Sequence, residues 1–320
     1  MHSNEMSAWC RHPFRGGPAT KLSIVIPTLN AASTLSRQLR AIFGQTLCPF
    51  EVLVADCNSS DGTADIARAL NTRVERLGNR PFGHGRTRRW ATELTSGDVI
   101  IFLTQDACPE DPEAFATLVR QLFDVSDAGM AYGRHMPYAD ATALSQHHRL
   151  YNYPSASVVK RITDAPTLQI KTCFASNSFA AYKRSALNAV GGFPEDAAFG
   201  EDVLVAAKML IAGFSIVYAA DAKVVHSHNL TIAESIRRYF SIGVFHGENW
   251  ELLARFGGTT REGLHFAASE IRYLVSARQL HLIPVSLAGN ALSWSAYWAG
   301  RLDRWISNPA RTNLGASSSI

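Results

Sequence analysis

The sequence predicts an α/β protein with a doubly wound, mostly parallel sheet flanked by helices and followed by a helical C-terminal region. Apolar runs of strand length at residues 23–28, 51–56 and 99–103 alternate with segments whose apolar residues recur at helical spacing. Parallel strands need such crossovers, and a run as apolar as 99–103 is typical of a central strand covered on both faces. Each run ends in polar residues, at the edge where open α/β sheets bind ligands.

The first half of the sheet is predicted from alternating strand and helix patterns. Leu35, Leu39 and Ile42 recur at helical spacing after the first strand, and Ser33 or Thr34 is the expected cap of that helix. The other elements expected in this half are a turn and helix at residues 58–70, a loop at 82–85, a helix at 86–94 and the strand at 99–103.

The second half continues the alternation but contains one long segment without clear periodicity. An amphipathic helix is expected at residues 113–123, whereas residues 134–168 are irregular and aromatic. Long irregular segments inside a domain are usually functional or mobile. The remaining expected elements are strands at residues 129–132, 178–182, 215–219 and 223–225, and helices at 183–190, at 203–211 and throughout the region from 231.

The composition is that of a globular protein without nucleic-acid-binding character. The 320 residues are 47% hydrophobic and 18% charged, and the net charge is only +4, so no nucleic-acid partner is expected. Five cysteines without a Cys-x-x-Cys pair do not indicate a zinc site and fit a reducing compartment. Residues 1–20 lack an apolar core segment, so we expect a flexible lead-in and a cytoplasmic location.

The polar strand ends form the first candidate site. They are Thr28, Asn30, Asp56 and Asp106. Carboxylates accept hydrogen bonds from base N–H groups or ribose hydroxyls, and one of them can hold a divalent metal on a diphosphate. The sequence has no G-x-G-x-x-G after the first strand and no G-x-x-x-x-G-K-[ST], which argues against a dinucleotide oxidoreductase and a P-loop NTPase. The pattern indicates a nucleotide site, with ordinary turn chemistry as the alternative.

Glu201 and Asp202 stand at the start of a predicted helix and have two interpretations. Acids at a helix N-terminus complement its dipole and cap its free N–H groups, which is a purely structural role. The functional interpretation is a general base beside an acceptor. The turn at residues 191–194 precedes this helix, and the bare backbone of Gly191 and Gly192 could let a substrate approach closely.

His226 and His228 follow a predicted strand and are a second ambiguous feature. We expect the two side chains to face opposite ways, so that one is a metal ligand or acid–base group and the other packs. Arg86, Arg88 and Arg89 could neutralise a diphosphate, or they could form a solvated helix face.

Taken together, these motifs resemble glycosyltransferase family 2, whose members have the Rossmann-like GT-A fold. The matching segments are residues 24–30, 54–63, 102–107 and 191–193 and the pair Glu201-Asp202. Further segments look like bacterial rhamnosyltransferases of polysaccharide and O-antigen assembly: residues 83–88, 103–107, 151–154, 176–179, 226–229 and 238–240. The resemblance extends from about residue 22 to about residue 272.

The resemblance implies a role for each matching position. Asp202 would be the catalytic base with Glu201 beside it, and Asp106 and His226 would hold Mg²⁺ or Mn²⁺. The nucleotide-sugar would be bound by Pro27, Thr28, Asn30, Asp56, Arg88, Thr104, Gln105 and Asp106. The sugar or acceptor would lie near Ser176, Asn177, Gly191, Gly192 and Phe193. On this basis residues 21–110 are the nucleotide-binding part, 111–228 the acceptor part and 229–320 a helical region.

Two positions depart from the pattern that the resemblance implies. The family's Asp-Asp pair after the second strand is Asp56-Cys57, which puts the usual contact from the second Asp to the base in doubt. The first Asp of the family's Asp-x-Asp element is Thr104. That Asp often reaches the ribose in relatives, and a thymidine nucleotide lacks the 2′-hydroxyl. We therefore hypothesise that Thr104 reflects a deoxyribose donor.

The expected activity is inverting transfer of rhamnose from dTDP-rhamnose to a lipid-linked or growing glycan. Asp202 would deprotonate the acceptor hydroxyl, and a metal on Asp106 would stabilise the departing diphosphate. The alternatives are the same fold using another nucleotide sugar, or a catalytically silent protein that binds nucleotide or glycan, conceivable because of Thr104.

The C-terminal region carries an apolar helical stripe beside arginines. The stripe comprises Leu287, Ala291, Trp294, Trp298, Leu302 and Trp305, with Arg301 and Arg304 alongside. Interspersed polar residues make a spanning helix unexpected. Tryptophans beside arginines suit a helix lying on the inner-membrane surface, which would make the protein peripheral on the cytoplasmic face. The alternative is packing on the main domain or at an oligomer interface.

Overall fold

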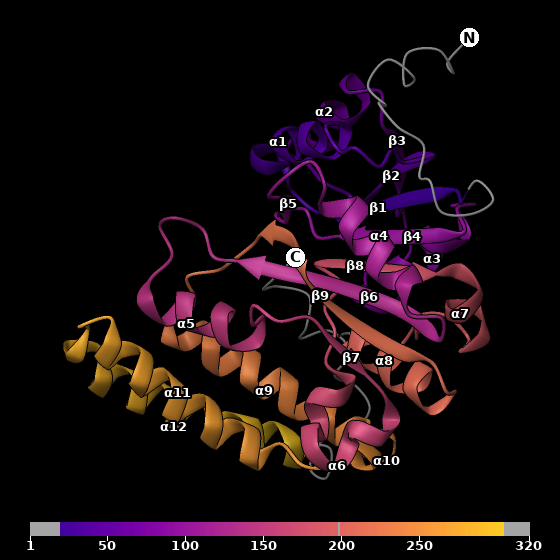
Figure 1. Cartoon of the computed structure of the whole chain (residues 1–320). Helices are drawn as coiled ribbons and strands as arrows, with labels where there is room; N and C mark the ends of the chain where they lie inside the picture. Colours follow the sequence, from indigo (N-terminus) through magenta and orange to yellow (C-terminus); the bar gives the residue numbers. More distant parts are fainter. Residues whose placement is uncertain (1–19, 198, 304–320) are drawn as a thin grey trace.

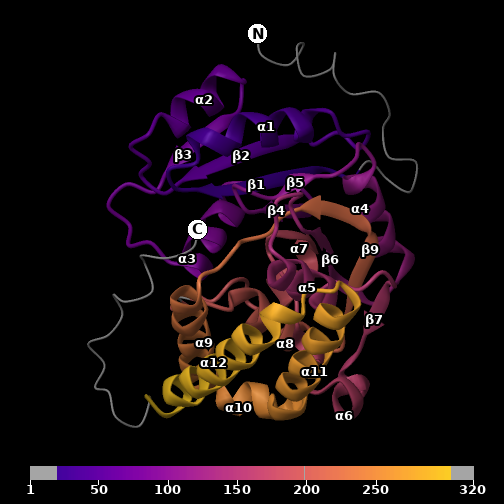
Figure 2. The same ribbon diagram turned by 90° about the vertical axis from the view of Figure 1, so that its left-hand side faces the viewer.

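The computed structural model describes residues 20–197 and 199–303, so nearly all of the expected lead-in lies outside the described residues. Its centre is a nine-stranded sheet with the order β3-β2-β1-β4-β8-β6-β9-β5, and β7 pairs with β9. Helices cover both faces of the sheet, and further helices gather at the end of the molecule away from α1 and α2 (Figures 1 and 2).

The first half of the sheet is parallel, as the alternation of strands and helices predicts. Its strands are β1 (Leu22–Thr28), β2 (Glu51–Asp56), β3 (Arg73–Arg76) and β4 (Val99–Leu103). All residues of β1 and β4 are buried, because both faces are covered by helices. The sequence pattern does not predict β3, because this short edge strand carries charged residues that break the apolar run.

The second half of the sheet is mixed. Its strands are β5 (Cys108–Pro109), β6 (Ala128–Met136), β7 (Val158–Lys160), β8 (Phe179–Lys183) and β9 (Ser215–Val225). Strand β8 runs antiparallel to both β4 and β6, so β6 and its parallel neighbour β9 point the same way as β1 to β4. The expected fold class, a mostly parallel sheet flanked by helices, is confirmed.

Two layers of helices enclose the sheet. One apolar core contains residues of α1 (Ala32–Phe43), α2 (Thr63–Ala69) and α4 (Ala114–Asp124). The other contains residues of α3 (His84–Glu93), α7 (Arg184–Ala189) and α8 (Glu201–Ile211). Each helix turns one apolar stripe to the sheet, as the helical spacing of Leu35, Leu39 and Ile42 predicts.

Several local expectations are wrong. The segment 134–168 is not irregular: it contains the end of β6, then α5 (Ala143–Asn152), β7 and α6 (Ala165–Leu168). The expected strands at 215–219 and 223–225 are one strand with an irregular register against β6. Neither Ser33 nor Thr34 caps α1; the cap residue is Ala31, and the Thr34 hydroxyl donates to backbone carbonyls of Ala31 and Gln105.

The elements after β9 are all helical in the described residues, as expected. They include α9 (Ile232–Glu248), α10 (Trp250–Leu253), α11 (Thr260–Ser276) and α12 (Ile283–Asp303). Helices α9 and α12 pack closely because Gly243 and Gly300 lie directly against the backbone of the opposite helix. Within residues 20–197 and 199–303, no helix combines the length and apolarity needed to cross a bilayer. Arg304 and Trp305 of the predicted stripe lie outside the described residues.

Candidate active site

The polar strand ends lie along one edge of the sheet. Strands β1, β2, β4, β6 and β9 run in the same direction, so their carboxyl ends share that edge. The antiparallel strand β8 starts there, because its first residue Phe179 pairs with Leu103, the last residue of β4. The turn containing Asn177 therefore lies beside Thr104, whose backbone N–H donates to the carbonyl of Ser178.

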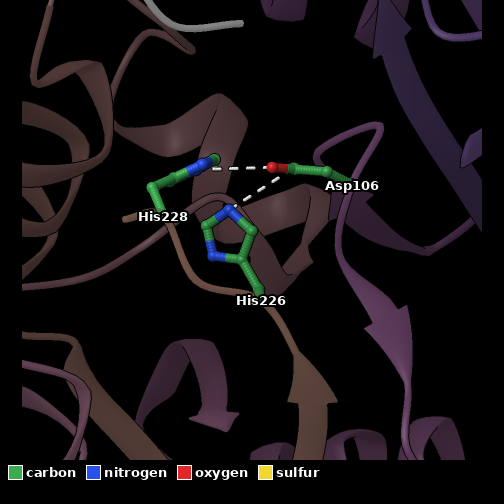
Figure 3. A group of neighbouring side chains, drawn as sticks. All are labelled: Asp106, His226 and His228. Atoms are coloured by element: carbon green, nitrogen blue, oxygen red, sulfur yellow. Dashed lines mark ion pairs between the residues drawn. The ribbon is translucent and has the colours of Figure 1, made fainter. Parts of the chain in front are cut away.

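Three side chains converge at this edge in an arrangement suited to a cation (Figure 3). Asp106 follows β4, and His226 and His228 follow β9. The Nε2 atom of His226 is 3.3 Å from Oδ1 of Asp106, and the Nε2 atom of His228 is 3.3 Å from Oδ2. One ligand atom from each residue lies within 4.8 Å of the others. The predicted metal pair thus gains His228 as a third member.

The expectation that the two histidines face opposite ways is wrong. The expectation misapplied the strand period, because residues two apart along a strand lie on the same face, and His226 and His228 directly follow the last strand residue Val225. Instead both rings point at Asp106 (Figure 3).

The electrostatics of the cluster fit a divalent metal. Burial raises the pKa of Asp106, but contact with His226 and the charges of both histidines outweigh it, so this pKa lies below its usual value. Burial lowers the pKa of His226, and it lowers that of His228 to about 4. The cluster is therefore one carboxylate and two neutral imidazoles at neutral pH, a mixed oxygen and nitrogen set that a divalent metal such as Mn²⁺ can use. Oδ1 of Asp106 is also buried without a hydrogen bond of good geometry.

A second histidine layer lies behind the cluster. His135 on β6 is almost fully buried, and its Nδ1 atom is 3.3 Å from Nδ1 of His226. Its ring stacks on Tyr153 with the ring centres 4.0 Å apart. Burial lowers the pKa of His135 well below its ordinary value.

Asp202 begins α8 and is held by two backbone donors. The N–H of Asn177 donates to Oδ2 at 3.2 Å, and the N–H of Val203 donates to Oδ1 at 2.9 Å. Burial and the charge of Glu201 raise the pKa of Asp202 to about 7. A carboxyl group with such a pKa can accept a proton near neutral pH.

Glu201 is buried and fully engaged. Its carboxylate pairs with Arg88 at 3.1 Å, and its Oε1 atom accepts from Nδ2 of Asn177 at 2.8 Å. The Oδ1 atom of Asn177 in turn accepts from the Tyr182 hydroxyl at 2.7 Å. These bonds fix the turn that holds Asp202. Arg88, expected near the nucleotide-sugar, is itself buried on Glu201.

The nucleotide-side residues are linked to one another. Asn30 adopts a left-handed conformation (φ 52°), and its Oδ1 atom accepts from the N–H of Ser60 at 3.0 Å. Asp56 accepts from the N–H of Ser59 and from Nε of Arg76. The hydroxyl oxygen of Thr28 is buried without a hydrogen-bond partner in the described part of the chain.

Three other predicted residues have structural contacts. Pro27 is part of the buried strand β1. Gln105 uses its amide to bridge the N–H and carbonyl of Leu29, at 2.7 and 3.2 Å, and so ties the end of β4 to the end of β1. Ser176 lies in the turn before β8, where its hydroxyl accepts from the N–H of Ser178 at 3.4 Å.

The turn at Gly191 and Gly192, which is expected near the acceptor, already makes contacts within the protein. Gly191 and Gly192 both have positive φ, which explains why glycine stands at these positions. The carbonyl of Gly191 accepts from Arg89 at 3.2 Å. The Phe193 ring is fully buried against Phe102, and the expected place of this residue near the acceptor or sugar stays a prediction.

Comparison with known proteins decides the family. The family model described as Glycosyl transferase family 2 matches residues 23–191, more than half of the chain. The chain belongs to glycosyltransferase family 2.

Its relatives and structural neighbours agree with this assignment. The chain is 41% identical to the O-antigen chain rhamnosyltransferase RfbN of Salmonella typhimurium, over 91% of this chain and 92% of that protein. It is 37% identical to the O-antigen chain rhamnosyltransferase WbaN of Salmonella anatum, over 91% of each. The mannosyltransferase PcManGT of Pyrobaculum calidifontis, solved with GDP-Man and Mn²⁺, has the same fold, with a TM-score of 0.62 and 18% identity over 95% of this chain and 93% of that one.

Sequence reasoning missed several residues of this family 2 site. Arg149 on α5 and Arg238 on α9 act electrostatically on His226 and His228, so two cations lie near the cluster. Tyr153 stacks on His135, and the charges of Arg149 and Asp202 both act on its hydroxyl group. Arg149 and Tyr153 come from the segment predicted to be irregular, where no helical period was recognised. The motif His-x-His directly after an apolar strand was the signal for His228.

Proposed function

We propose that this family 2 glycosyltransferase transfers rhamnose from dTDP-rhamnose to a growing, lipid-linked glycan, with inversion at the anomeric carbon. The observation that carries the proposal is the shared sheet edge, which brings Asp202, with a pKa raised to about 7, to the same side as Asp106, His226 and His228. The two O-antigen chain rhamnosyltransferases, each covering 91% of this chain, support rhamnose as the donor sugar.

Asp202 is the proposed general base. Its carboxylate takes the proton of the acceptor hydroxyl while that oxygen attacks the anomeric carbon and the bond to the nucleoside diphosphate breaks. The Asn177 and Val203 amides hold the carboxylate in one orientation during this step. The buried pair of Glu201 and Arg88 supports that turn without taking part in proton transfer.

We propose that the diphosphate of the donor binds beside Asp106, His226 and His228. Asp106, His226 and His228 would hold Mg²⁺ or Mn²⁺, which supplies positive charge for the diphosphate when bound. Arg149 and Arg238 add positive charge beside the same cluster and would attract the nucleotide-sugar before reaction.

Thr104 is the proposed reason for a thymidine donor. Its hydroxyl oxygen is buried, and it offers no carboxylate to a ribose 2′-hydroxyl. A dTDP-sugar has no such hydroxyl, so nothing in the donor is left without a partner. A UDP-sugar would leave its 2′-hydroxyl unpaired there, which would weaken its binding.

Helix α12 is the proposed membrane-facing element. Residues 283–300 carry no charged side chain, although Val285, Leu287 and Leu292 are each 43% exposed or more. Arg301 stacks on the partly exposed Trp298, with 5.4 Å between the guanidinium and the ring centre. An apolar face with an arginine at its end suits attachment to an anionic membrane surface, where a lipid-linked acceptor would lie.

The proposal is tested by measuring rhamnose transfer from dTDP-rhamnose to a lipid-linked glycan acceptor, for the wild type and for Asp202→Asn. We expect the variant to bind dTDP normally and to lose about 10²- to 10⁴-fold in turnover, because a general base contributes that much. Glu195→Gln is the control, because Glu195 is an exposed partner of Arg89 away from the base. Near-normal turnover by Asp202→Asn refutes the assignment of the base.

A further inference from the structure

His135 lies directly behind the candidate metal cluster and has no assigned role. It comes from β6, whose end pairs with the end of β9 just before His226. Its Nδ1 atom is 3.3 Å from Nδ1 of His226, and its Nε2 atom is buried without a hydrogen-bond partner in the described residues. The side chain is 1% exposed, so neither nitrogen can rely on bulk water.

The contact between the two Nδ1 atoms restricts where the protons lie. Two neutral imidazoles can share a hydrogen bond only if one Nδ1 carries a proton and the other is bare. When the proton of His226 lies on Nε2, which faces Oδ1 of Asp106 at 3.3 Å, its Nδ1 is unprotonated and His135 must be the donor. When Nε2 of His226 binds a cation through its lone pair, its Nδ1 carries the proton and His135 must accept.

We propose that His135 is the positioning residue that sets the tautomer of His226, donating to it in the metal-free protein and accepting from it when a cation is bound. This inference rests on the metal site of the proposed function. In the exchange the proton between the two Nδ1 atoms passes from His135 to His226, the cation displaces the Nε2 proton of His226 to water, and Nε2 of His135 takes one proton up from water, so each imidazole keeps one proton and the pair has no net gain or loss. Metal-bound histidines are usually held by a carboxylate or carbonyl, and here a second imidazole takes that place.

The competing explanation is that His135 only fills space. Its ring stacks on Tyr153 at 4.0 Å and contacts His226 edge to face, so an aromatic ring of similar size would preserve the packing. Two substitutions separate the roles. His135→Phe keeps an aromatic ring but has no acceptor, whereas His135→Asn loses the ring but places a carbonyl oxygen where Nδ1 stands.

The experiment measures Mn²⁺ affinity of the full-length protein by electron paramagnetic resonance, with the metal alone and no nucleotide. We expect His135→Phe to bind Mn²⁺ about 10- to 100-fold more weakly than the wild type, the usual effect of losing such a partner. His135→Asn is expected to bind within a few-fold of the wild type. Thermal unfolding of each variant confirms that it is folded before titration.

The outcomes distinguish this inference from the proposed function. Unchanged affinity in His135→Phe overturns the positioning role alone, and so does an equal loss in both variants. Loss in His135→Asn with retention in His135→Phe assigns the residue to packing. A wild type that binds no Mn²⁺ overturns the metal site together with the role of His135. Loss in His135→Phe with retention in His135→Asn supports the inference.

Discussion

Asp202 is the residue whose environment most directly predicts a measurable property. Burial and the neighbouring charge of Glu201 raise its pKa to about 7, and Arg88 opposes them. A general base must be deprotonated to act, so kcat/KM should rise with pH and level off above about 7. The measurement is a pH profile of transfer from dTDP-rhamnose at low donor concentration.

Glu201→Gln tests the cause of that pKa. Removing the negative charge of Glu201 leaves Arg88 uncompensated, and both changes favour the ionised form of Asp202. The inflection of the profile should therefore move to lower pH. Glu195→Gln, which removes an exposed acid from Arg89, should leave the inflection in place. An inflection that stays fixed in Glu201→Gln contradicts the electrostatic coupling.

Helices α9 and α12 show how an element is positioned by its smallest residues. A Cβ at Gly300 would collide with the backbone of Phe240, whereas a Cβ at Gly289 on the same helix would meet nothing within 4 Å. We expect Gly300→Val to destabilise the protein by about 1–3 kcal/mol through overpacking. We expect Gly289→Ala to be neutral or stabilising by up to about 1 kcal/mol. Thermal unfolding of both variants checks this, and equal melting temperatures would count against close packing of α9 on α12.

The exposed face of α12 is the proposed membrane-binding surface, and charged substitutions there test it. Leu287→Glu combined with Leu292→Glu should abolish co-sedimentation with liposomes containing anionic lipid, because the charges oppose insertion into the headgroup region. Ile211→Glu is a matched control at the end of α8, where the side chain is 38% exposed. Wild-type protein that ignores anionic liposomes would remove the membrane assignment altogether.

The whole molecule responds to ligand through mass action. A ligand that binds only the folded state at 100 times its dissociation constant adds about 2.7 kcal/mol of stability. We expect dTDP with Mn²⁺ to raise the melting temperature by several degrees, and UDP with Mn²⁺ to raise it less because of Thr104. Asp106→Ala should remove the part of the shift that depends on Mn²⁺. Equal shifts for dTDP and UDP would rule out the donor preference.

The catalytic sheet and the C-terminal helices are tied together by polar contacts, so the candidate site and α12 belong to one structure. Lys171 pairs with Glu262 of α11 at 2.7 Å, and the Tyr273 hydroxyl donates to Gln146 of α5 at 2.9 Å. Helix α5 also carries Arg149, whose charge acts on His228 of the candidate metal cluster. Helix α11 packs on both α5 and α12, so these helices connect the proposed membrane face to the candidate site.

The sequence by itself determined the central strands of the first half of the sheet and the residue types at their ends. Apolar runs that end in polar residues predict β1, β2 and β4. Because parallel strands point the same way, their carboxyl ends share one edge of the sheet, which brings Thr28, Asp56 and Asp106 to that edge. Glu201-Asp202 was recognisable as a helix start by its local pattern. These features depend on residues close together in the chain, and the spacing of apolar and polar residues reflects such local relationships.

Only the tertiary structure decided which side chains meet. His226 and His228 both meet Asp106 because the ends of β9 and β4 lie at the same edge of the folded sheet, a contact between distant segments that the local pattern does not report. His135 and Tyr153 lie behind the cluster because β6 pairs with β9 and α5 folds back on the sheet, contacts between residues far apart in the chain. Burial, which raises the pKa of Asp202, likewise depends on the packing of the whole molecule. The spacing of residues within a short segment does not depend on contacts with distant segments, so it cannot predict them.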